Sequence, residues 1–600
     1  MKTRLTSLLI KTLLVVFLFV GFLLVWASLQ SFETLASLLN HLASDGELES
    51  FTMLLYRILK IPFAVVGIGL ALLAGFMLFR WKNTEIWLRE FPTQTKQFFS
   101  MLPKDMLSFI KDVKLGFVNL GKVNNFILLG VIFVSAVVRL EDLHFPLSHD
   151  EAYMYGAFAS RSLWHMVSNY HLPNNHVLLS VIMKITTILL GNHIWTLRLP
   201  TILAGVLMVP ATYFFAKRFY SIETAILSSI FVAVFPVLVL YSVLARGYAI
   251  IALFTLLLFI LADYIRNHKN RFAWLLIVLL SALGFFTIPI MLFPFGALYI
   301  WLIGSYFLKD TMSYEPRFDF LKYWVVSGLV AAFITILLYT PIFIYSYERF
   351  FGNGFIAPVE WNVFLVTIST RLRNTWMEWT EFIPLWISLL SVFGFLVSLI
   401  FHKRFSKQKF PLQIAFLIWI VIMLIVRRPD MLPRFWLFLA APILVWSAAG
   451  IVEPLKRIPF NLGRNWSPGQ VFVITIFAFV VVQSALKVPS LPARLGGKDD
   501  MEKTTIYLKD YLQQGDLVTA STARLPAMRY YFNYHGIPQG YIRESGKFQR
   551  AFIIVDNSKN ETLHSDAPKL GFDVSAIDED TAKILVQFDY LTVYECSPRQ

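Results

Sequence analysis

Cysteine is almost absent from this chain of 600 residues, in which Cys596 is the only one. A single thiol excludes a disulfide framework and a cysteine-based metal site within one chain. Charged side chains are also scarce, at 15% of the residues, whereas an ordinary soluble domain has about 25%. Because 57% of the residues are hydrophobic, the composition excludes a soluble globular protein.

The sequence instead contains many apolar runs near the length of roughly 20 residues that crosses the hydrocarbon of a bilayer. We therefore expect a polytopic α-helical membrane protein with about 13 transmembrane helices. The expected spans are 8–29, 58–79, 124–140, 197–216, 223–243, 247–265, 272–289, 291–308, 322–345, 382–401, 411–426, 435–452 and 470–487. The first run resembles a signal peptide, but its length and the lack of a clear cleavage site favour a retained helix.

The apolar run 176–190 is short for a span, and the basic residues decide how it is interpreted. The positive-inside rule places clusters of lysine and arginine in the cytoplasm. With that placement the crossings alternate correctly only if 176–190 is an interfacial or re-entrant helix on the outer side. The alternative, in which 176–190 crosses, would place 266–271 outside. The basic clusters are 81–122, 217–218, 266–271, 403–409 and 456–457.

This topology predicts a multi-pass protein of the plasma (inner) membrane, with a cytoplasmic N-terminus and an extracytoplasmic C-terminus. It also explains the net charge of +15 without a nucleic-acid partner, because the basic residues lie in short clusters between apolar runs.

Three domains are expected. Residues 1–122 form an N-terminal two-helix membrane module whose basic cytoplasmic linker either lies on an anionic membrane surface or is a solvated loop. Residues 123–488 form the transmembrane core. Residues 489–600 form a small extracytoplasmic α/β domain, because a helical pattern is followed by short strand-like runs. That helix is expected at 500–514 and the strands at 551–555, 582–588 and 591–594.

Asp150 and Glu151 form an acidic pair in the first external loop, beside His149 and Tyr153. Adjacent carboxylates repel, and partial burial raises their pKa further. A carboxylate in such a place can act as a general base toward a hydroxyl or an amine. It could also bind a divalent cation through oxygen ligands, although no residue is assigned as a metal ligand. The competing interpretation is an ordinary solvated loop.

Three further groups of polar residues are expected on the same face. Asn174, Asn175 and His176 begin the short helix, where they suit an anion or a sugar, or simply cap the helix. Arg246 lies between two spans and can pair with a phosphate or contact a lipid headgroup. The external loop 427–434 carries three arginines against the positive-inside tendency, and binding an anionic ligand is one reason for that exception. They are Arg427, Arg428 and Arg434.

The order of these motifs resembles the membrane glycosyltransferases of the GT-C fold. The resemblance is to the family 39-like group, which includes protein O-mannosyltransferases and the aminoarabinose transferase of lipid A. It covers roughly 124–450, so it implies a GT-C-like core. The motifs are His149-Asp150-Glu151-Ala152, Pro173-Asn174-Asn175-His176, Trp195-Thr196-Leu197-Arg198-Leu199-Pro200, Lys217-Arg218-Phe219-Tyr220, Ala245-Arg246-Gly247-Tyr248 and Pro433-Arg434-Phe435. Two features depart from the family pattern: many relatives have a proline-rich stretch where Asn174-Asn175-His176 stands, and residues 1–122 have no counterpart.

The resemblance implies an inverting hexosyl- or pentosyltransferase that uses a polyprenyl-phosphate donor at the outer face. The acceptor would be a lipid, a glycan or a protein. Asp150 would be the base that deprotonates the acceptor, and Glu151 would support it or position the acceptor. The site residues implied are Arg246, Arg434 and Arg428 for the donor phosphate, and His149, Tyr153, Asn174, Asn175 and His176 for the substrates.

Two other classes of function fit the sequence less well. Many helices and external arginines would also suit a transporter or flippase of lipid-linked envelope precursors, but such proteins normally keep ionisable sites near the membrane midplane. Here most charge lies at the predicted helix ends. The third class is a non-catalytic scaffold that binds a sugar-linked lipid phosphate without turning it over.

Overall fold

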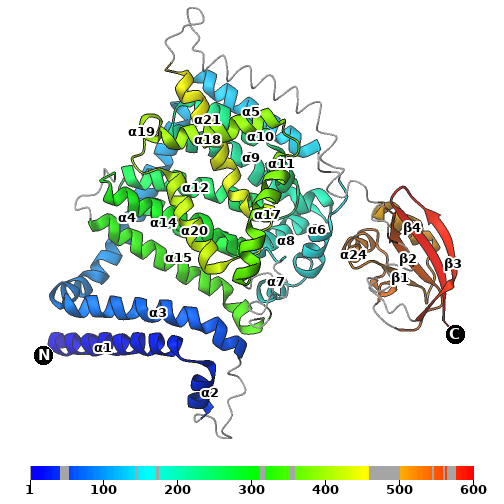
Figure 1. Cartoon of the computed structure of the whole chain (residues 1–600), viewed down its shortest axis with the longest axis horizontal. Helices are drawn as coiled ribbons and strands as arrows, with labels where there is room; N and C mark the ends of the chain where they lie inside the picture. The colour runs from blue at the N-terminus through cyan, green and yellow to red at the C-terminus, as the bar shows by residue number, and fades with distance from the viewer. Residues whose placement is uncertain are drawn as a thin grey trace, which may run out of the picture. The chain divides into compact units, whose positions relative to one another are not determined.

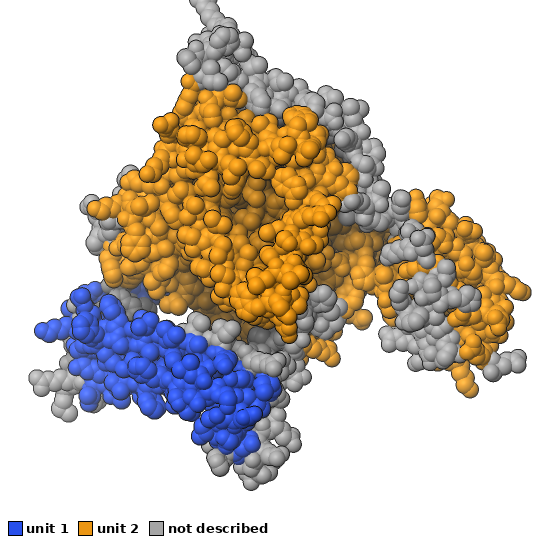
Figure 2. All heavy atoms as spheres, in the orientation of Figure 1, with its two compact units in different colours: residues 1–108 blue, residues 109–600 orange. Residues whose placement is uncertain are grey.

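The computed structural model describes most of the chain, which forms two compact units (Figure 2). These units are residues 1–108 and 109–600. The predicted span at 470–487 and the predicted domain boundary at 488 lie outside the described residues, so the three-domain division stays a prediction. The described residues are 2–40, 53–141, 143, 145–170, 174–310, 318–346, 349, 358–457, 500–543, 546–557, 561, 563 and 576–599.

The first unit is helical and is held together by the contact between α1 and α3. A Cβ built on Gly67 would lie 2.7 Å from the carbonyl oxygen of Gly21, so the two backbones touch. Small residues allow this kind of approach between apolar helices. The unit contains α1 (Lys2–Leu29), α2 (Phe32–Asn40), α3 (Met53–Phe79) and the first part of α4 (Trp81–Val118).

The second unit is a large helical bundle followed by a small α/β domain (Figure 1). The helices of the bundle's first half are α5 (Lys122–Glu141), α6 (His149–Met154), η2 (Tyr155–Ala159), α7 (Leu163–Ser168), α8 (Val177–Leu190), α9 (Ile194–Phe219), α10 (Ile222–Val234) and α11 (Pro236–Val243). The second half contains α12 (Tyr248–Asn267), α13 (Arg271–Thr287), η3 (Pro289–Met291), α14 (Leu292–Phe307), α15 (Phe318–Tyr345), α17 (Trp361–Thr380), α18 (Leu385–Ile400), α19 (His402–Phe405), α20 (Leu412–Arg427), η4 (Pro433–Trp436) and α21 (Leu437–Leu455).

The polytopic α-helical membrane class predicted from the sequence is confirmed. Among the described residues, seven helices are long and apolar enough to cross a membrane, or up to nine if each of two bent helix pairs is one span. The bends are 54° between α10 and α11 and 117° between α17 and α18. Pro236 and Pro384 stand at these breaks, where proline disfavours helix in the residue before it. The total of about 13 spans stays a prediction.

Helix α12 runs through the centre of the bundle and is buried over most of its length. Its C-terminal end is fixed by buried charges. Arg266 pairs with Asp310 and stacks over the Trp301 ring, with 4.7 Å between the guanidinium carbon and the ring centroid. Arg218 of α9 lies 3.0 Å from Asp263 of the same cluster. This cluster holds α12 in place, and the opposite end of the helix begins at Tyr248, next to Arg246.

Helix α8 contains 14 residues and ends at Leu190, followed by the C-cap residue Gly191, whose φ of 88° suits glycine. A helix of this length spans about 21 Å, which is short of the roughly 30 Å of hydrocarbon. This length fits a re-entrant or interfacial helix. That α8 begins and ends on the outer side of the membrane stays a prediction.

The topology can be tested with cysteines introduced one at a time, after Cys596 is replaced by serine. Burial raises the pKa of the Cys596 thiol to about 11, so this cysteine reacts poorly in any case. We expect Asn192→Cys to be labelled by an impermeant thiol reagent in intact cells, and Lys269→Cys only after permeabilisation. The reverse pattern would show that α8 crosses the membrane.

The small α/β domain at the C-terminus is confirmed. Its sheet has the strand order β1-β2-β4-β3, with β1 and β2 parallel and the other pairs antiparallel. The predicted helix and three predicted strands are present, whereas β1 and α24 were not expected. The elements are α23 (Met501–Tyr511), β1 (Leu517–Ala520), α24 (Leu525–Tyr534), η7 (Gln539–Tyr541), β2 (Ala551–Asp556), β3 (Ile577–Gln587) and β4 (Leu591–Pro598).

Candidate active site

The acidic pair lies on α6, a helix of six residues between α5 and α8. Ser148 caps this helix: its Oγ accepts a hydrogen bond from the N–H of Glu151 at 3.4 Å, and Glu151 Oε2 accepts one from the N–H of Ser148 at 3.0 Å. This reciprocal capping box fixes the start of α6. It also separates the two acids, because Glu151 is fully buried while 40% of the Asp150 side chain is exposed.

Glu151 forms a buried ion pair with Arg198 of α9. Arg198 Nε and Nη2 donate to the two carboxylate oxygens at 2.9 and 3.0 Å, and the N–H of Ala245 donates to Oε1 at 2.7 Å. Burial alone would raise the pKa of Glu151, but the charge and hydrogen bonds of Arg198, helped by the two backbone N–H groups, hold it below its usual value. The expectation of a raised pKa is therefore wrong for Glu151.

Arg198 also holds the chain that leads into α6. Its Nη1 donates to the carbonyl oxygens of Leu143 and Phe145 at 3.1 and 2.9 Å, and its Nη2 donates to that of Pro146 at 3.1 Å. In the sequence, Arg198 stood out only as part of a motif. The signal that could have identified it is an arginine near the N-terminus of an apolar helix, where a buried cation requires an acidic partner.

Asp150 faces the other way, toward Arg246. Its Oδ2 lies 3.3 Å from Arg246 Nη1, and the Arg246 side chain is only 6% exposed. The Nδ2 of Asn174 donates to the Asp150 carbonyl oxygen at 3.2 Å, and Arg246 in turn donates to Asn174 Oδ1. Three residues far apart in the sequence thus form one cluster around a partly exposed carboxylate.

Arg434 lies at the edge of the same cluster, beside Tyr248 and Asp150. Within the described part of the chain, its Nε is buried without a hydrogen-bond partner. His176 accepts a hydrogen bond at Nδ1 from the N–H of Gly247 at 2.8 Å. Burial lowers the pKa of His176 well below its usual value of 6.5, and Arg246 and Arg434 lower it further, so the imidazole is neutral. The cluster's net positive charge therefore comes from its arginines.

The loop before Arg434 is held by α17. Arg371 Nη1 donates to the carbonyl oxygen of Pro429 at 3.0 Å, and its Nη2 lies 3.1 Å from Asp430 Oδ1. Arg428 ends α20 in a left-handed conformation with φ of 38°. Its Nε donates to the Val359 carbonyl oxygen at 2.8 Å, and its guanidinium carbon lies 4.7 Å from the centroid of the Trp361 ring. The structure thus places Arg428 against the segment that leads into α17 rather than beside Asp150.

Three other predicted site residues have different surroundings. Asn175 is buried, and its Nδ2 donates to the carbonyl oxygens of Met166 and Asn169 at 2.9 and 2.8 Å, so it fixes the loop fold. His149 and Tyr153 stack on each other on α6, with 6.1 Å between their ring centroids. Both residues lie on the acidic helix.

The C-terminal domain contacts the acidic helix, which the sequence did not indicate. His149 Nδ1 lies 2.7 Å from the carbonyl oxygen of Ala523, in the turn after β1. The Tyr531 hydroxyl of α24 accepts a hydrogen bond from the N–H of Leu147 at 3.4 Å, and the rings of Tyr155 and Tyr530 meet edge to face at 5.6 Å. The turn and helix that follow β1 therefore support both ends of α6.

The surroundings of the acidic pair do not fit a divalent cation. Both oxygens of Glu151 are occupied by Arg198 and backbone N–H groups, and the nearest charged partner of Asp150 is a cation. Among the described residues, no group of three or more His, Cys, Asp or Glu side chains is placed to hold a metal.

Comparisons with known proteins bear on the family. The model of the family described as dolichyl-phosphate-mannose-protein mannosyltransferase matches residues 175–336. The sequence matches none of the curated proteins with which it was compared. Among solved structures, ArnT from Cupriavidus metallidurans in the apo state aligns with a TM-score of 0.51 at 10% identity, over 79% of this chain and 98% of ArnT.

Two other solved structures align less closely. ArnT from the same organism bound to undecaprenyl phosphate gives a TM-score of 0.46 at 12% identity, over 79% of this chain and 97% of ArnT. The apo oligosaccharyltransferase of Archaeoglobus fulgidus gives 0.44 at 12% identity, over 72% of this chain and 69% of that one. The matched family segment and the fold shared with apo ArnT confirm the resemblance of this chain to the GT-C fold membrane glycosyltransferases.

Proposed function

We propose that this protein transfers a hexosyl or pentosyl group from a polyprenyl-phosphate donor to an acceptor at the outer face of the membrane. The observation that carries the proposal is the partly exposed carboxylate of Asp150, 3.3 Å from the buried guanidinium of Arg246 and beside Arg434. One base and two cations are the groups that this transfer needs, and they stand together in a GT-C fold.

The chemistry follows from these positions. Asp150 accepts the proton of an acceptor hydroxyl or amine as that group attacks the anomeric carbon. The bond between this carbon and the phosphate oxygen breaks on the opposite face, which inverts the configuration. The electron pair leaves with the polyprenyl phosphate, whose charge Arg246 and Arg434 stabilise. A phosphate leaves readily, so no acid catalyst is required.

Glu151 has a supporting part in this proposal. Its carboxylate is fully buried and bonded to Arg198, so it has no oxygen free for an acceptor. We assign it as a positioning residue that fixes α6 and thereby aims Asp150 at the acceptor.

The relatives support the donor class. A solved structure of ArnT from Cupriavidus metallidurans holds undecaprenyl phosphate, which is a polyprenyl phosphate. The matching family model describes enzymes that use mannose linked to dolichyl phosphate, another long isoprenoid phosphate. In this proposal the acceptor is a lipid, a glycan or a protein, and the charge pattern of the chain favours a reaction at the outer face of the plasma membrane.

Replacing Arg246 with alanine tests the donor site. A hydrogen bond to a charged group contributes about 1.5–3 kcal/mol, so the Kd for a radiolabelled polyprenyl-phosphate sugar should rise on the order of 10- to 100-fold. Arg373→Ala is the matched control, because Arg373 is an exposed arginine on α17 outside the cluster. Equal donor affinity of wild-type protein and Arg246→Ala would contradict the assignment.

A further inference from the structure

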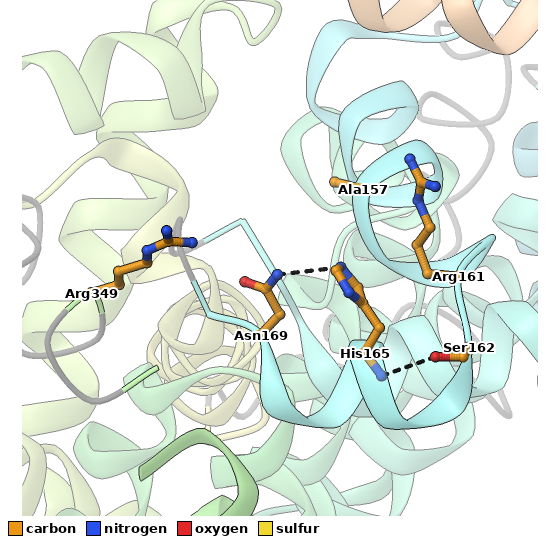
Figure 3. A pocket seen from close by; sticks show the side chains of 6 residues that line it. All are labelled: Ala157, Arg161, Ser162, His165, Asn169 and Arg349. Atoms are coloured by element: carbon orange, nitrogen blue, oxygen red, sulfur yellow. Dashed lines mark hydrogen bonds between the residues drawn. The ribbon is translucent and has the colours of Figure 1, made fainter. Parts of the chain in front are cut away.

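A second polar site is formed largely by the segment that follows the acidic helix. It is a cavity of about 410 Å³ lined by residues of η2, of α7 and its flanking loops, and by Arg349 after α15. Figure 3 shows Arg349 on one side of the cavity, His165 and Arg161 on the other, and Asn169 between them. No acidic side chain is among the lining residues, which are Ala157, Arg161, Ser162, His165, Asn169 and Arg349. The cavity therefore presents positive charge and hydrogen-bond donors.

The two arginines of this cavity make few hydrogen bonds to other described residues. Arg161 Nε donates to the Gly156 carbonyl oxygen at 3.2 Å. Its two Nη groups make no hydrogen bond or ion pair within the described structure. Arg349 makes no hydrogen bond or ion pair with any described residue. Two hydrogen bonds fix the residues around the cavity. Lys184 Nζ donates to the Arg161 carbonyl oxygen at 2.6 Å, and Asn169 Nδ2 lies 3.2 Å from His165 Nε2. Two exposed guanidinium groups thus border one preformed cavity.

Exposed apolar and aromatic residues adjoin the lining residues in the chain, and together they are called the rim below. Leu163 and Trp164 of α7 are each more than half exposed, and so are Ile344 and Tyr345 at the end of α15. The rings of Trp164 and Tyr345 meet edge to face at 5.2 Å and join the two elements. Tryptophan and tyrosine gather where a membrane's hydrocarbon meets its headgroups.

The position of α15 gives the depth of the cavity. Phe318–Tyr345 is one of the candidate spans, and most of its surface is exposed as a lipid-facing helix requires. Its last residue is Tyr345, so Arg349 follows the end of the span by four residues. Arg349 therefore lies just beyond the end of a candidate span, where lipid headgroups are expected, and Ile344 and Tyr345 belong to the last turn of that span.

We propose that this cavity binds the phosphate headgroup of an anionic membrane lipid, whose chains lie on the rim formed by Leu163, Trp164, Ile344 and Tyr345. Arginine suits a phosphate because its planar guanidinium can donate two parallel hydrogen bonds. A free phosphate would not use the apolar rim, which favours the lipid as the source of the anion. The lining shares no residue with the cluster around Asp150, so this site is separate from the proposed donor site.

The test is lipid binding to the purified full-length protein in detergent, measured by native mass spectrometry during titration with phosphatidylglycerol or phosphatidylcholine. We expect wild-type protein to prefer phosphatidylglycerol, and the Arg161→Gln/Arg349→Gln variant to bind it at least about tenfold more weakly. Arg349→Gln alone, which removes no bond within the described structure, should show part of this loss. Arg373→Gln is the matched control and should bind like the wild type.

Three results would overturn the proposal. One is equal phosphatidylglycerol affinity of the wild type and both the single and double variants. Another is equal affinity of the wild type for phosphatidylglycerol and phosphatidylcholine. A third arm adds inorganic phosphate as a competitor: complete displacement of the lipid at millimolar phosphate would show that the anion alone is bound, and would overturn the lipid assignment.

Discussion

Replacing Asp150 with asparagine is expected to lower the rate of sugar transfer by about 10²–10⁴-fold, which is the usual contribution of a general base. Asparagine has nearly the same shape as aspartate but cannot accept the proton of the acceptor. The Asp150 side chain is 40% exposed, and Arg246 keeps its hydrogen bond to Asn174 after the change, so the fold should be retained. The rate is measured with a radiolabelled polyprenyl-phosphate sugar.

Donor binding gives this prediction a second readout. In the wild type, Asp150 lies 3.3 Å from Arg246 and competes with a phosphate for that guanidinium. Asp150→Asn removes this competing charge, so the donor Kd should stay the same or decrease while transfer is lost. Asp319→Asn is the control, because Asp319 is a partly exposed acid that pairs with Lys269 elsewhere in the chain. Full activity of Asp150→Asn would disprove the role of Asp150.

Replacing Glu151 with glutamine is expected to have the largest effect on stability. The change leaves Arg198 as a buried cation without its counter-charge, and breaking a buried ion pair in this way costs about 3–5 kcal/mol. We expect a clear fall in the free energy of unfolding in detergent. Combining Glu151→Gln with Arg198→Met should recover part of the loss, because the uncompensated charge is then removed.

The matched control is an ion pair near the surface. Lys456 and Glu223 lie 2.7 Å apart and are both partly exposed, so Glu223→Gln should cost less than about 1 kcal/mol.

The pH dependence of the stability follows from the lowered pKa of Glu151. Its stabilising contribution is complete above the usual value of 4.5 and is lost as the pH falls through the lower folded-state pKa. Equal stability of Glu151→Gln and the wild type would show that the pair is not essential to the fold.

Much of the architecture could be predicted because it depends on local patterns. Apolar runs predicted the membrane helices, and short strand-like runs predicted β2, β3 and β4. The β1 strand escaped prediction because it has only four residues, whereas the fully buried β2 has six. The helix α24 that follows it carries the contacts to α6, and these long-range contacts have no local signal.

The candidate site was predicted in part. The charge pattern placed Asp150, Arg246 and Arg434 on one face, and the structure brings these three together. The pairing of Glu151 with Arg198 could not be predicted from spacing, since 47 residues separate the partners and only the packing of α6 against α9 joins them. Arg428 differs: its place in an arginine-rich loop suggested a phosphate contact, whereas its guanidinium packs over the Trp361 ring, so its assignment to the donor phosphate stays a prediction.

In the proposed reaction, this protein breaks the bond between a sugar and a polyprenyl phosphate. The most direct test is to reconstitute the full-length protein in liposomes with a doubly labelled polyprenyl-phosphate sugar and a membrane extract as the source of acceptors. We predict that free polyprenyl phosphate appears in step with labelled acceptor, and that Asp150→Asn produces neither. Movement of the intact donor across the bilayer, with no release of polyprenyl phosphate, would contradict the claim and identify a flippase.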